Sequence, residues 1–336
     1  MRPKTFRGAV AVLLSLFLQC ALPASAERLD PAAIAAFSQQ MSARYGFNAE
    51  SLTATLAQAQ RRDTILTTIA KPAEHKPWYV YRPIFMTAER IDAGVRFWTE
   101  HAAVLARAEQ EYGVPASIIV AIIGVETFYG RNTGNFRVIE ALGTLAFHYP
   151  PRATFFRAEL ENFFLLARDE NLDALTPTGS YAGAMGLPQF MPSSFRNFAV
   201  DFDRDGHRDI WRNPDDAIGS VANYLKKHGW VARQAIVMPV MPGTANAALA
   251  SDKLELKRTA AQFMAAGVRT FDPVDPELPA VLIAYESKEG AEYWLGFKNF
   301  YAITRYNRSP KYALAVAQLA DAMVNKRRPA AAAKQP

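Results

Sequence analysis

Cysteine is almost absent from this chain of 336 residues, and the only one, Cys20, lies in a segment that we expect to be removed. Without it the chain forms no disulfide and has no thiol for catalysis or metal binding. Long apolar runs are absent too, because residues 9–18 form a stretch too short to cross a bilayer. Since 50% of the residues are hydrophobic, we expect a globular protein held together by its core alone.

Residues 1–26 have the pattern of a signal peptide. Three basic residues within positions 2–7 precede the apolar stretch, and Ala24-Ser25-Ala26 is typical of a cleavage site. We therefore expect a periplasmic protein whose mature chain begins at Glu27. Lipid attachment through Cys20 is the alternative, which the absence of a small residue just before the cysteine disfavours.

Motifs of several enzyme classes are also missing. The sequence has no G-x-x-x-x-G-K-[ST] phosphate loop, no H-E-x-x-H zinc motif and no G-x-S-x-G nucleophile turn. The formal charge of +6 falls to +3 when the three basic residues of the signal peptide are removed. This mildly basic balance suits an anionic polymer and is too weak to indicate nucleic acid, so we expect no nucleic-acid partner.

Helical periodicity dominates the first two thirds of the chain, and short strands follow, which predicts a mainly α (α+β) fold. The predicted helices cover residues 31–45, 50–69, 88–112, 115–126, 154–169, 214–229 and 312–323, and the predicted strands cover 235–240, 278–286 and 291–297. We divide the chain into a signal peptide (1–26), an N-terminal helical region (27–77), a core (78–232) with a loop at 201–216, a strand-containing region (233–300), a C-terminal segment with a helix (301–325) and a disordered tail (326–336).

Glu126 is unusual because it ends a helix that is apolar nearly all round. Ile122 and Ile123, four and three residues earlier, lie on its side of the helix. A carboxylate there also faces the negative end of the helix macrodipole. Both effects favour the protonated acid, which is the form that cleavage of a glycosidic bond requires. An ordinary glutamate that points to solvent at a helix end is the alternative.

A glycine-rich segment at 179–194 is the second candidate. It reads GSYAGAMGLPQFMPSS, and its small residues let a ligand approach the backbone closely. Ser180 and Gln189 could hydrogen-bond a sugar or the acid. The alternative is a loop that only precedes a helix beginning at Ser193 or Ser194.

The third candidate is a calcium loop of the EF-hand type at 201–212. Carboxylates stand at loop positions 1, 3, 5 and 9, with glycine at position 6. Position 12 is Arg212, where a bidentate glutamate is expected, so Asp215 or Asp216 would supply the missing ligand. These two aspartates could instead only serve the N-terminus of a helix capped by Asn213. We expect a calcium ion with a structural role.

Several motifs occur in a fixed order: Gly124-Val125-Glu126-Thr127, Gly183-Ala184-Met185-Gly186, Gln189-Phe190-Met191-Pro192-Ser193-Ser194, Asp205-Gly206-His207 and Ala217-Ile218-Gly219-Ser220-Val221-Ala222-Asn223-Tyr224. Together they resemble the lytic murein transglycosylase B family, glycoside hydrolase family 103, over about residues 78–320. The resemblance implies a lysozyme-like core, flanked by a helical region and a small strand-containing region. It implies peptidoglycan glycan strands as substrate and no catalytic cofactor. We expect a monomer, with other cell-wall enzymes as candidate partners.

The resemblance also implies roles for individual residues. Glu126 would be the single acid/base, with Ser180 and Gln189 beside it. Further cleft positions are matched by Tyr81, Phe190, Tyr224, Tyr306, Asn307 and Tyr312, although each tyrosine could be a core ring with a satisfied hydroxyl. The implied calcium ligands are Asp201, Asp203, Asp205, His207 through its carbonyl, and Asp216; one extra residue between Trp211 and Ala217 leaves Asp215 open instead. Phe155 stands where the family has a cleft tyrosine.

The implied reaction cuts the β-1,4 bond between N-acetylmuramic acid and N-acetylglucosamine. Glu126 would protonate the bridging oxygen and then accept a proton from the sugar 6-hydroxyl, which leaves a 1,6-anhydromuramyl end. Two alternatives stay open: a muramidase that uses water, and a calcium-stabilised wall-binding scaffold without catalysis.

Overall fold

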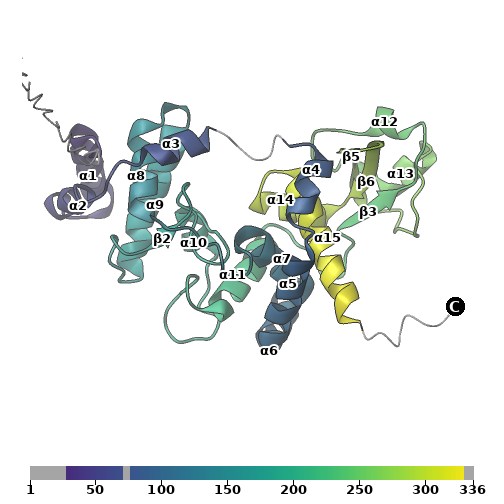
Figure 1. Ribbon diagram of the computed structural model, residues 1–336, viewed down its shortest axis with the longest axis horizontal. Coiled ribbons are helices and arrows are strands. Elements are labelled where there is room, and N and C mark those ends of the chain that lie inside the picture. The colour runs from purple at the N-terminus through teal and green to yellow at the C-terminus, as the bar shows by residue number, and fades with distance from the viewer. Residues whose placement is uncertain (1–27, 71–75, 329–336) are drawn as a thin grey trace, which may run out of the picture.

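The computed structural model describes residues 28–70 and 76–328. The predicted signal peptide and Cys20 lie outside these residues. The molecule is elongated, with α1 (Pro31–Tyr45) and α2 (Ala49–Leu56) at one end and the larger sheet, formed by strands within residues 237–296, at the other (Figure 1). Within the described ranges, no helix combines the length and the apolar character needed to cross a membrane.

The N-terminal helices begin and end largely where local signals place them. The side chain of Asp30 caps α1 by accepting the amide of Ala32, and Gly46 ends the helix with a φ of 71°. The single helix predicted over 50–69 is wrong, because α2 ends at Leu56 and α3 (Asp63–Ile69) follows. The intervening chain turns so that the amide of Gln60 and the guanidinium of Arg62 reach the buried Glu140.

The helix predicted over 88–112 is also divided, into α5 (Ala88–Glu100) and α6 (Ala102–Tyr112). His101 leaves the helical conformation between them with a ψ of 25°, and its ring packs on that of Phe97 at 4.5 Å. The apolar stripe is shared by two helices with different neighbours, since α5 packs on α15 (Pro310–Arg327) while α6 packs on α11 (Pro214–Lys227). Periodicity alone did not reveal this break.

The central helix α7 (Ala116–Thr127) is buried on nearly every side, as its apolar sequence predicts. It packs against α5, α6, α11 and α15. Helix α9 (Ala153–Asp169) confirms the prediction for 154–169, while α8 (Val138–His148), which packs on it, was not predicted. The remaining helical elements are α4 (Trp78–Tyr81), η2 (Arg82–Ile84), η3 (Pro150–Arg152), α10 (Pro192–Phe198), α12 (Asn246–Leu249), α13 (Ala260–Ala265) and α14 (Lys298–Tyr306).

The three predicted strands are confirmed, and they form one antiparallel sheet. The predicted strands are β3 (Val237–Val240), β5 (Pro279–Ser287) and β6 (Gly290–Gly296), and a short fourth strand, β4 (Arg258–Thr259), was not predicted. The strands lie in the order β3-β6-β5-β4. This sheet has a small core of its own around Phe263, Leu282 and Leu295. A second ladder pairs β1 (Phe136–Arg137) with β2 (Thr178–Gly179) within the helical part. The fold is therefore mainly α with a small strand-containing part, as predicted.

Helix α15 corrects the prediction at the C-terminus. It runs from Pro310 to Arg327, longer than the predicted 312–323. The disordered tail predicted from residue 326 is wrong for its first two residues, which belong to this helix. The length matters for the site, because α15 brings residues near the C-terminus against α7.

Candidate active site

Glu126 lies in the last turn of α7 and is half-buried. Ile122 and Ile123 are fully buried, as the sequence predicts for the apolar side of this helix. The hydroxyl of Tyr312 donates a hydrogen bond to Oε1 of Glu126 at 2.7 Å. The acid therefore sits where the end of a buried helix meets the first turn of α15.

Three tyrosines form one wall beside Glu126. The rings of Tyr306 and Tyr312 are stacked, with centroids 6.4 Å apart and an angle of 11°. Tyr306 donates its hydroxyl to the carbonyl of Pro188, and Tyr224 donates to the carbonyl of Arg305, both at 2.6 Å. These bonds join α11 to α14, and α14 to the glycine-rich segment.

Burial keeps these tyrosines protonated. Desolvation, followed by the charge of Glu126, raises the pKa of Tyr306 and of Tyr312 well above the usual value. Burial raises the pKa of Tyr224 to about 12. Near neutral pH the three hydroxyls are therefore hydrogen-bond donors.

The other cleft residues expected from the family lie around this wall. Phe190 is buried, and its ring lies 5.6 Å from that of Tyr224 and 5.8 Å from that of Tyr306, so it supports both. Tyr81 is buried, with its ring 5.1 Å from that of Phe85. Asn307 is half-buried in the turn between α14 and α15. Direct contact of these residues with a substrate stays a prediction.

The glycine-rich segment forms a tight loop, and Ser180 and Gln189 line one pocket in it. The hydroxyl of Ser180 accepts the amides of Ala182 and Ala184. Gln189 has a φ of 51° and donates its side-chain amide to the carbonyls of Gly186 and Thr133. The two residues are thus brought together on one rim.

Gly186 shows why this loop needs glycine. Its φ is 66°, and a Cβ there would lie 2.3 Å from the carbonyl oxygen of Ile210. Any side chain would push the loop away from residue 210, where the amide of Leu187 is also bonded. The close approach fixes the glycine-rich loop against the last residues of the predicted calcium loop.

Thr127 connects the acid to this loop. Its hydroxyl contacts the carbonyl of Ile123 in its own helix at 3.1 Å and that of Leu187 at 3.0 Å. It also accepts the amide of Gly130. The residue next to Glu126 therefore sets the spacing between the end of α7 and the glycine-rich rim.

Arg90 was not found from the sequence. Its guanidinium donates to the carbonyl of Gly124 and lies over the rings of Phe128 and Phe85, at 4.5 Å and 5.5 Å. A cation at this end of α7 offsets the partial negative charge of the helix C-terminus. That partial charge was one of the two effects expected from the sequence to favour a protonated Glu126. The sequence offered no signal for it, because Arg90 lies in another helix, 34 positions from Gly124.

Replacing Tyr312 by phenylalanine tests the contact with the acid. We expect kcat to fall about 10- to 100-fold, because a hydrogen bond to a carboxylate contributes about 1.5–3 kcal/mol. The melting temperature should change little, since phenylalanine keeps the packing of the ring. Steady-state rates on soluble glycan fragments measure the effect, and Tyr301→Phe, on an exposed ring of α14, is the control. An unchanged kcat in Tyr312→Phe would show that the bond has no part in the reaction.

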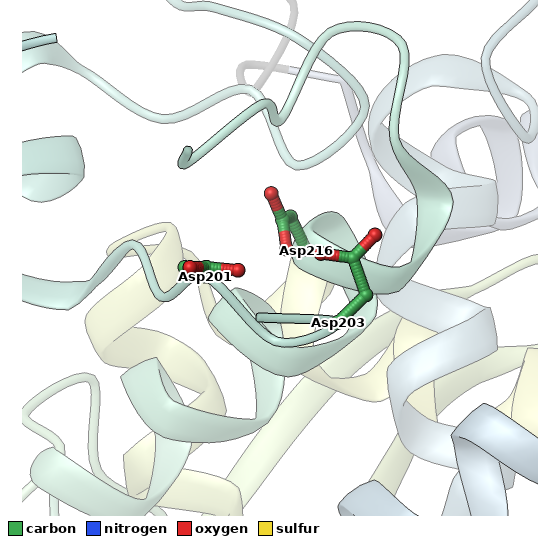
Figure 2. A group of neighbouring side chains, drawn as sticks. All are labelled: Asp201, Asp203 and Asp216. Atoms are coloured by element: carbon green, nitrogen blue, oxygen red, sulfur yellow. The ribbon is translucent and has the colours of Figure 1, made fainter. Parts of the chain in front are cut away.

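The predicted calcium loop brings three carboxyl groups together. Asp201 and Asp203, from the loop, lie next to Asp216, from the first turn of α11 (Figure 2). One oxygen from each lies within 4.8 Å of the others. Asp216 is fully buried, and its two oxygens accept the amides of Phe202 and Asp209, each at 2.7 Å. Asp216 therefore holds the loop at two points, near its start at Phe202 and later at Asp209.

The other predicted ligands lie differently. The side chain of Asp205 is exposed and lies outside this group of carboxylates, and it accepts the amide of His207, whose predicted ligand atom is the backbone carbonyl oxygen. Asp209 accepts the amides of Trp211 and Arg212 in its own turn. Between the two candidates left open by the sequence, Asp216 joins the cluster and Asp215 does not. Binding of an ion through Asp205 and His207 stays a prediction.

Comparison with known proteins decides the family. A family model described as "Transglycosylase SLT domain" matches residues 30–321. The chain belongs to this transglycosylase family. A curated relative, membrane-bound lytic murein transglycosylase B of Escherichia coli strain K12, is 44% identical over 300 residues, which are 85% of this chain and 81% of that protein.

Solved structures of lytic transglycosylases have the same fold. The soluble lytic transglycosylase SltB1 of Pseudomonas aeruginosa is 51% identical, with a TM-score of 0.83 over 88% of this chain and 99% of that one. The Escherichia coli lytic transglycosylase Slt35, solved in complex with calcium, is 44% identical, with a TM-score of 0.80 over 88% of this chain and 93% of that one. The lysozyme-like fold expected from the resemblance is thereby confirmed.

Proposed function

We propose that this transglycosylase cleaves the β-1,4 bond between N-acetylmuramic acid and N-acetylglucosamine with Glu126 as its only acid/base. One observation carries the proposal: a half-buried carboxyl group ends the buried helix α7 and is held by the hydroxyl of Tyr312. The names of the relatives, lytic transglycosylases from two bacteria, support the same reaction.

In the first step Glu126 gives its proton to the bridging oxygen as the bond to the anomeric carbon breaks. The substrate's own 2-acetamido oxygen stabilises the positive charge that develops on the sugar. A second carboxylate is not needed for this scheme. The buried acids Glu140, Glu159 and Glu161 are held elsewhere, by Arg62, by Ser193 and by Arg44.

In the second step the ionised Glu126 takes the proton of the 6-hydroxyl, whose oxygen attacks the anomeric carbon. The products are a free 4-hydroxyl on one fragment and a 1,6-anhydromuramyl end on the other, with no water consumed. Glu126 regains its proton and is ready for another turnover. Tyr312 remains a donor throughout and holds Oε1 in place.

Digestion in water enriched in oxygen-18 separates this reaction from that of a muramidase. We expect no label in the muramic acid ends and products lighter by one water than hydrolysed fragments, because the attacking oxygen comes from the sugar. Mass spectrometry of the released fragments measures both the oxygen-18 content and the mass difference of one water. Labelled reducing ends would show a muramidase, and release of no soluble fragment would favour a binding scaffold.

We further propose a structural calcium ion at Asp201, Asp203 and Asp216. Calcium prefers six to eight oxygen ligands, and these three carboxylates supply oxygens at a spacing that suits a shared cation. Burial, and then the neighbouring Asp203 and Asp201, raises the pKa of Asp216. A cation would offset this repulsion. The calcium complex of Slt35 supports the assignment.

The proposed location is the periplasm, where peptidoglycan lies. The signal-peptide pattern of residues 1–26 supports export, and lipid attachment through Cys20 remains the alternative. The name of the Escherichia coli relative describes that protein as membrane-bound. We propose a monomer that works on glycan strands, with other cell-wall enzymes as candidate partners.

A further inference from the structure

A second pocket lies between α4, the turn from β5 to β6, and α15. It is separate in its lining from the cleft residues described above. Three segments far apart in the chain contribute the side chains that matter here: Tyr79 and Arg82, then Lys288, Glu292 and Trp294, then Gln318. Helix α4 packs on β5, and the two lie near each other in Figure 1.

The pocket offers aromatic surface. Tyr79 is 37% exposed, Trp294 is half-buried, and the buried Trp78 also lines the pocket. Sugar rings present C–H groups on their faces, and these pack well on aromatic rings, which bury a large apolar area at low cost in side-chain entropy. A concave site with aromatic walls and a few fixed polar groups is typical of small-ligand recognition.

The polar groups of the pocket are held in place. One oxygen of Glu292, Oε1, accepts the indole N–H of Trp78 at 2.8 Å and that of Trp294 at 3.1 Å. Arg82 donates Nε to Oε1 of Gln318 at 2.6 Å. These bonds orient the rings and the planar polar groups before any ligand arrives, which lowers the entropy lost on binding. Hydroxyl and acetamido groups are suitable partners for a guanidinium, an amide and a carboxylate.

Contacts through α4 and β5 connect the pocket to Glu126. The ring of Trp78 lies 6.3 Å from that of Tyr81, a predicted cleft residue, and 5.2 Å from that of Tyr285. Tyr285 donates its hydroxyl to the carbonyl of Pro310 at 3.0 Å. Pro310 begins α15, and two residues later Tyr312 contacts Glu126. The pocket and the cleft therefore share α4, and Trp78 is connected to the start of α15 through Tyr285.

We propose that this pocket binds an additional N-acetylated sugar of the glycan strand, beyond the sugars that flank the bond being cut. The inference rests on the proposed function and extends it to strand length. A sugar fits better than the peptide attached to muramic acid, because the wall combines aromatic faces with one carboxylate among two cations rather than a purely cationic surface. Long strands would then bind more tightly than short ones.

Kinetics on peptide-free glycan fragments of four and eight sugars test the proposal. We expect Tyr79→Ala to lose about tenfold in kcat/KM on the eight-sugar fragment, mainly through KM, since about 1.4 kcal/mol of binding corresponds to that factor. The four-sugar fragment should change less than twofold. Arg82→Met should show the same pattern. Tyr301→Ala is the matched control, because that tyrosine is also 37% exposed but lies on α14, outside the pocket.

Equal losses on both lengths would overturn the proposal. A loss that appears only on strands carrying peptides would overturn it as well and would assign the pocket to the peptide. A readout without catalysis keeps the test separate from the proposed function. In Glu126→Gln protein, the eight-sugar fragment should shift the indole N–H signals of Trp78 and Trp294 in NMR spectra, and the four-sugar fragment should not. Unshifted indole signals at saturating eight-sugar fragment would contradict the pocket even if cleavage is confirmed.

Discussion

A Glu126→Gln variant is expected to cleave soluble glycan fragments about 1000-fold more slowly than the wild type, the range expected when a positioned acid/base is removed. Glutamine keeps the shape of the side chain, and its oxygen can still accept the hydrogen bond that Tyr312 donates to Oε1. It has no proton to give to the bridging oxygen and cannot take one from the 6-hydroxyl. Initial rates followed by chromatography of the fragments measure the loss.

The fold should survive this change. The melting temperature of Glu126→Gln is expected to match that of the wild type, and affinity for uncleaved glycan should persist. Glu277→Gln is the matched control, because Glu277 is an exposed glutamate in the strand-containing region, just before β5, and the substitution should leave the rate unchanged. Activity in Glu126→Gln close to that of the wild type would remove Glu126 as the catalyst.

Removal of calcium is expected to lower the melting temperature of the wild type by about 4 °C. An ion at 100 times its Kd adds about 2.7 kcal/mol to the stability of the native state, and a chain of about 300 residues unfolds with an entropy of about 0.6 kcal/mol per K. Without the ion, Asp201, Asp203 and Asp216 repel one another around a fully buried carboxyl group. Thermal unfolding with added calcium and with a chelator measures the difference. Magnesium should replace calcium poorly, since it demands a tighter octahedral geometry.

Asp216→Asn separates the ion from the rest of the loop. The amide oxygen can accept only one of the two backbone amides, of Phe202 and Asp209, that the carboxylate now accepts. We expect about 1–3 kcal/mol of destabilisation from the unsatisfied buried donor, and no further change on chelation. Asp215→Asn should keep the response to calcium, because Asp215 lies outside the cluster. A wild type whose melting temperature does not respond to calcium would contradict the site.

Local sequence signals predicted the fold best where they are strongest. The cap at Asp30 and the stop at Gly46 predicted α1, and segments rich in Val, Ile, Tyr and Trp predicted the strands of the main sheet. Long stripes of apolar residues at helical spacing were less reliable, because they did not show where one helix ends and the next begins. The breaks near Gln60 and at His101 follow from tertiary contacts, with Glu140 and with different partner helices, and these leave no mark on an apolar stripe.

The candidate site could be predicted only in part for a related reason. Glu126 stood out because a charged residue in an apolar helix is locally visible. Its partner Tyr312 lies 186 positions away, and the family resemblance rather than any pattern in the residues indicated it. Arg90 and the pocket that contains Trp294 had neither kind of signal, because each depends on how separate elements pack. The calcium cluster is intermediate: spacing predicted Asp201 and Asp203, while the structure was needed to choose Asp216.

Digestion of intact peptidoglycan sacculi by the wild type and by Glu126→Gln, with products read by mass spectrometry, tests the central claim most directly. The claim is that one carboxyl group on α7 both donates and accepts the proton of a water-free cleavage. It predicts that the wild type releases muropeptides with 1,6-anhydro ends, and that the variant releases them about 1000-fold more slowly. Hydrated reducing ends from the wild type, or anhydro products from the variant at the wild-type rate, would contradict it.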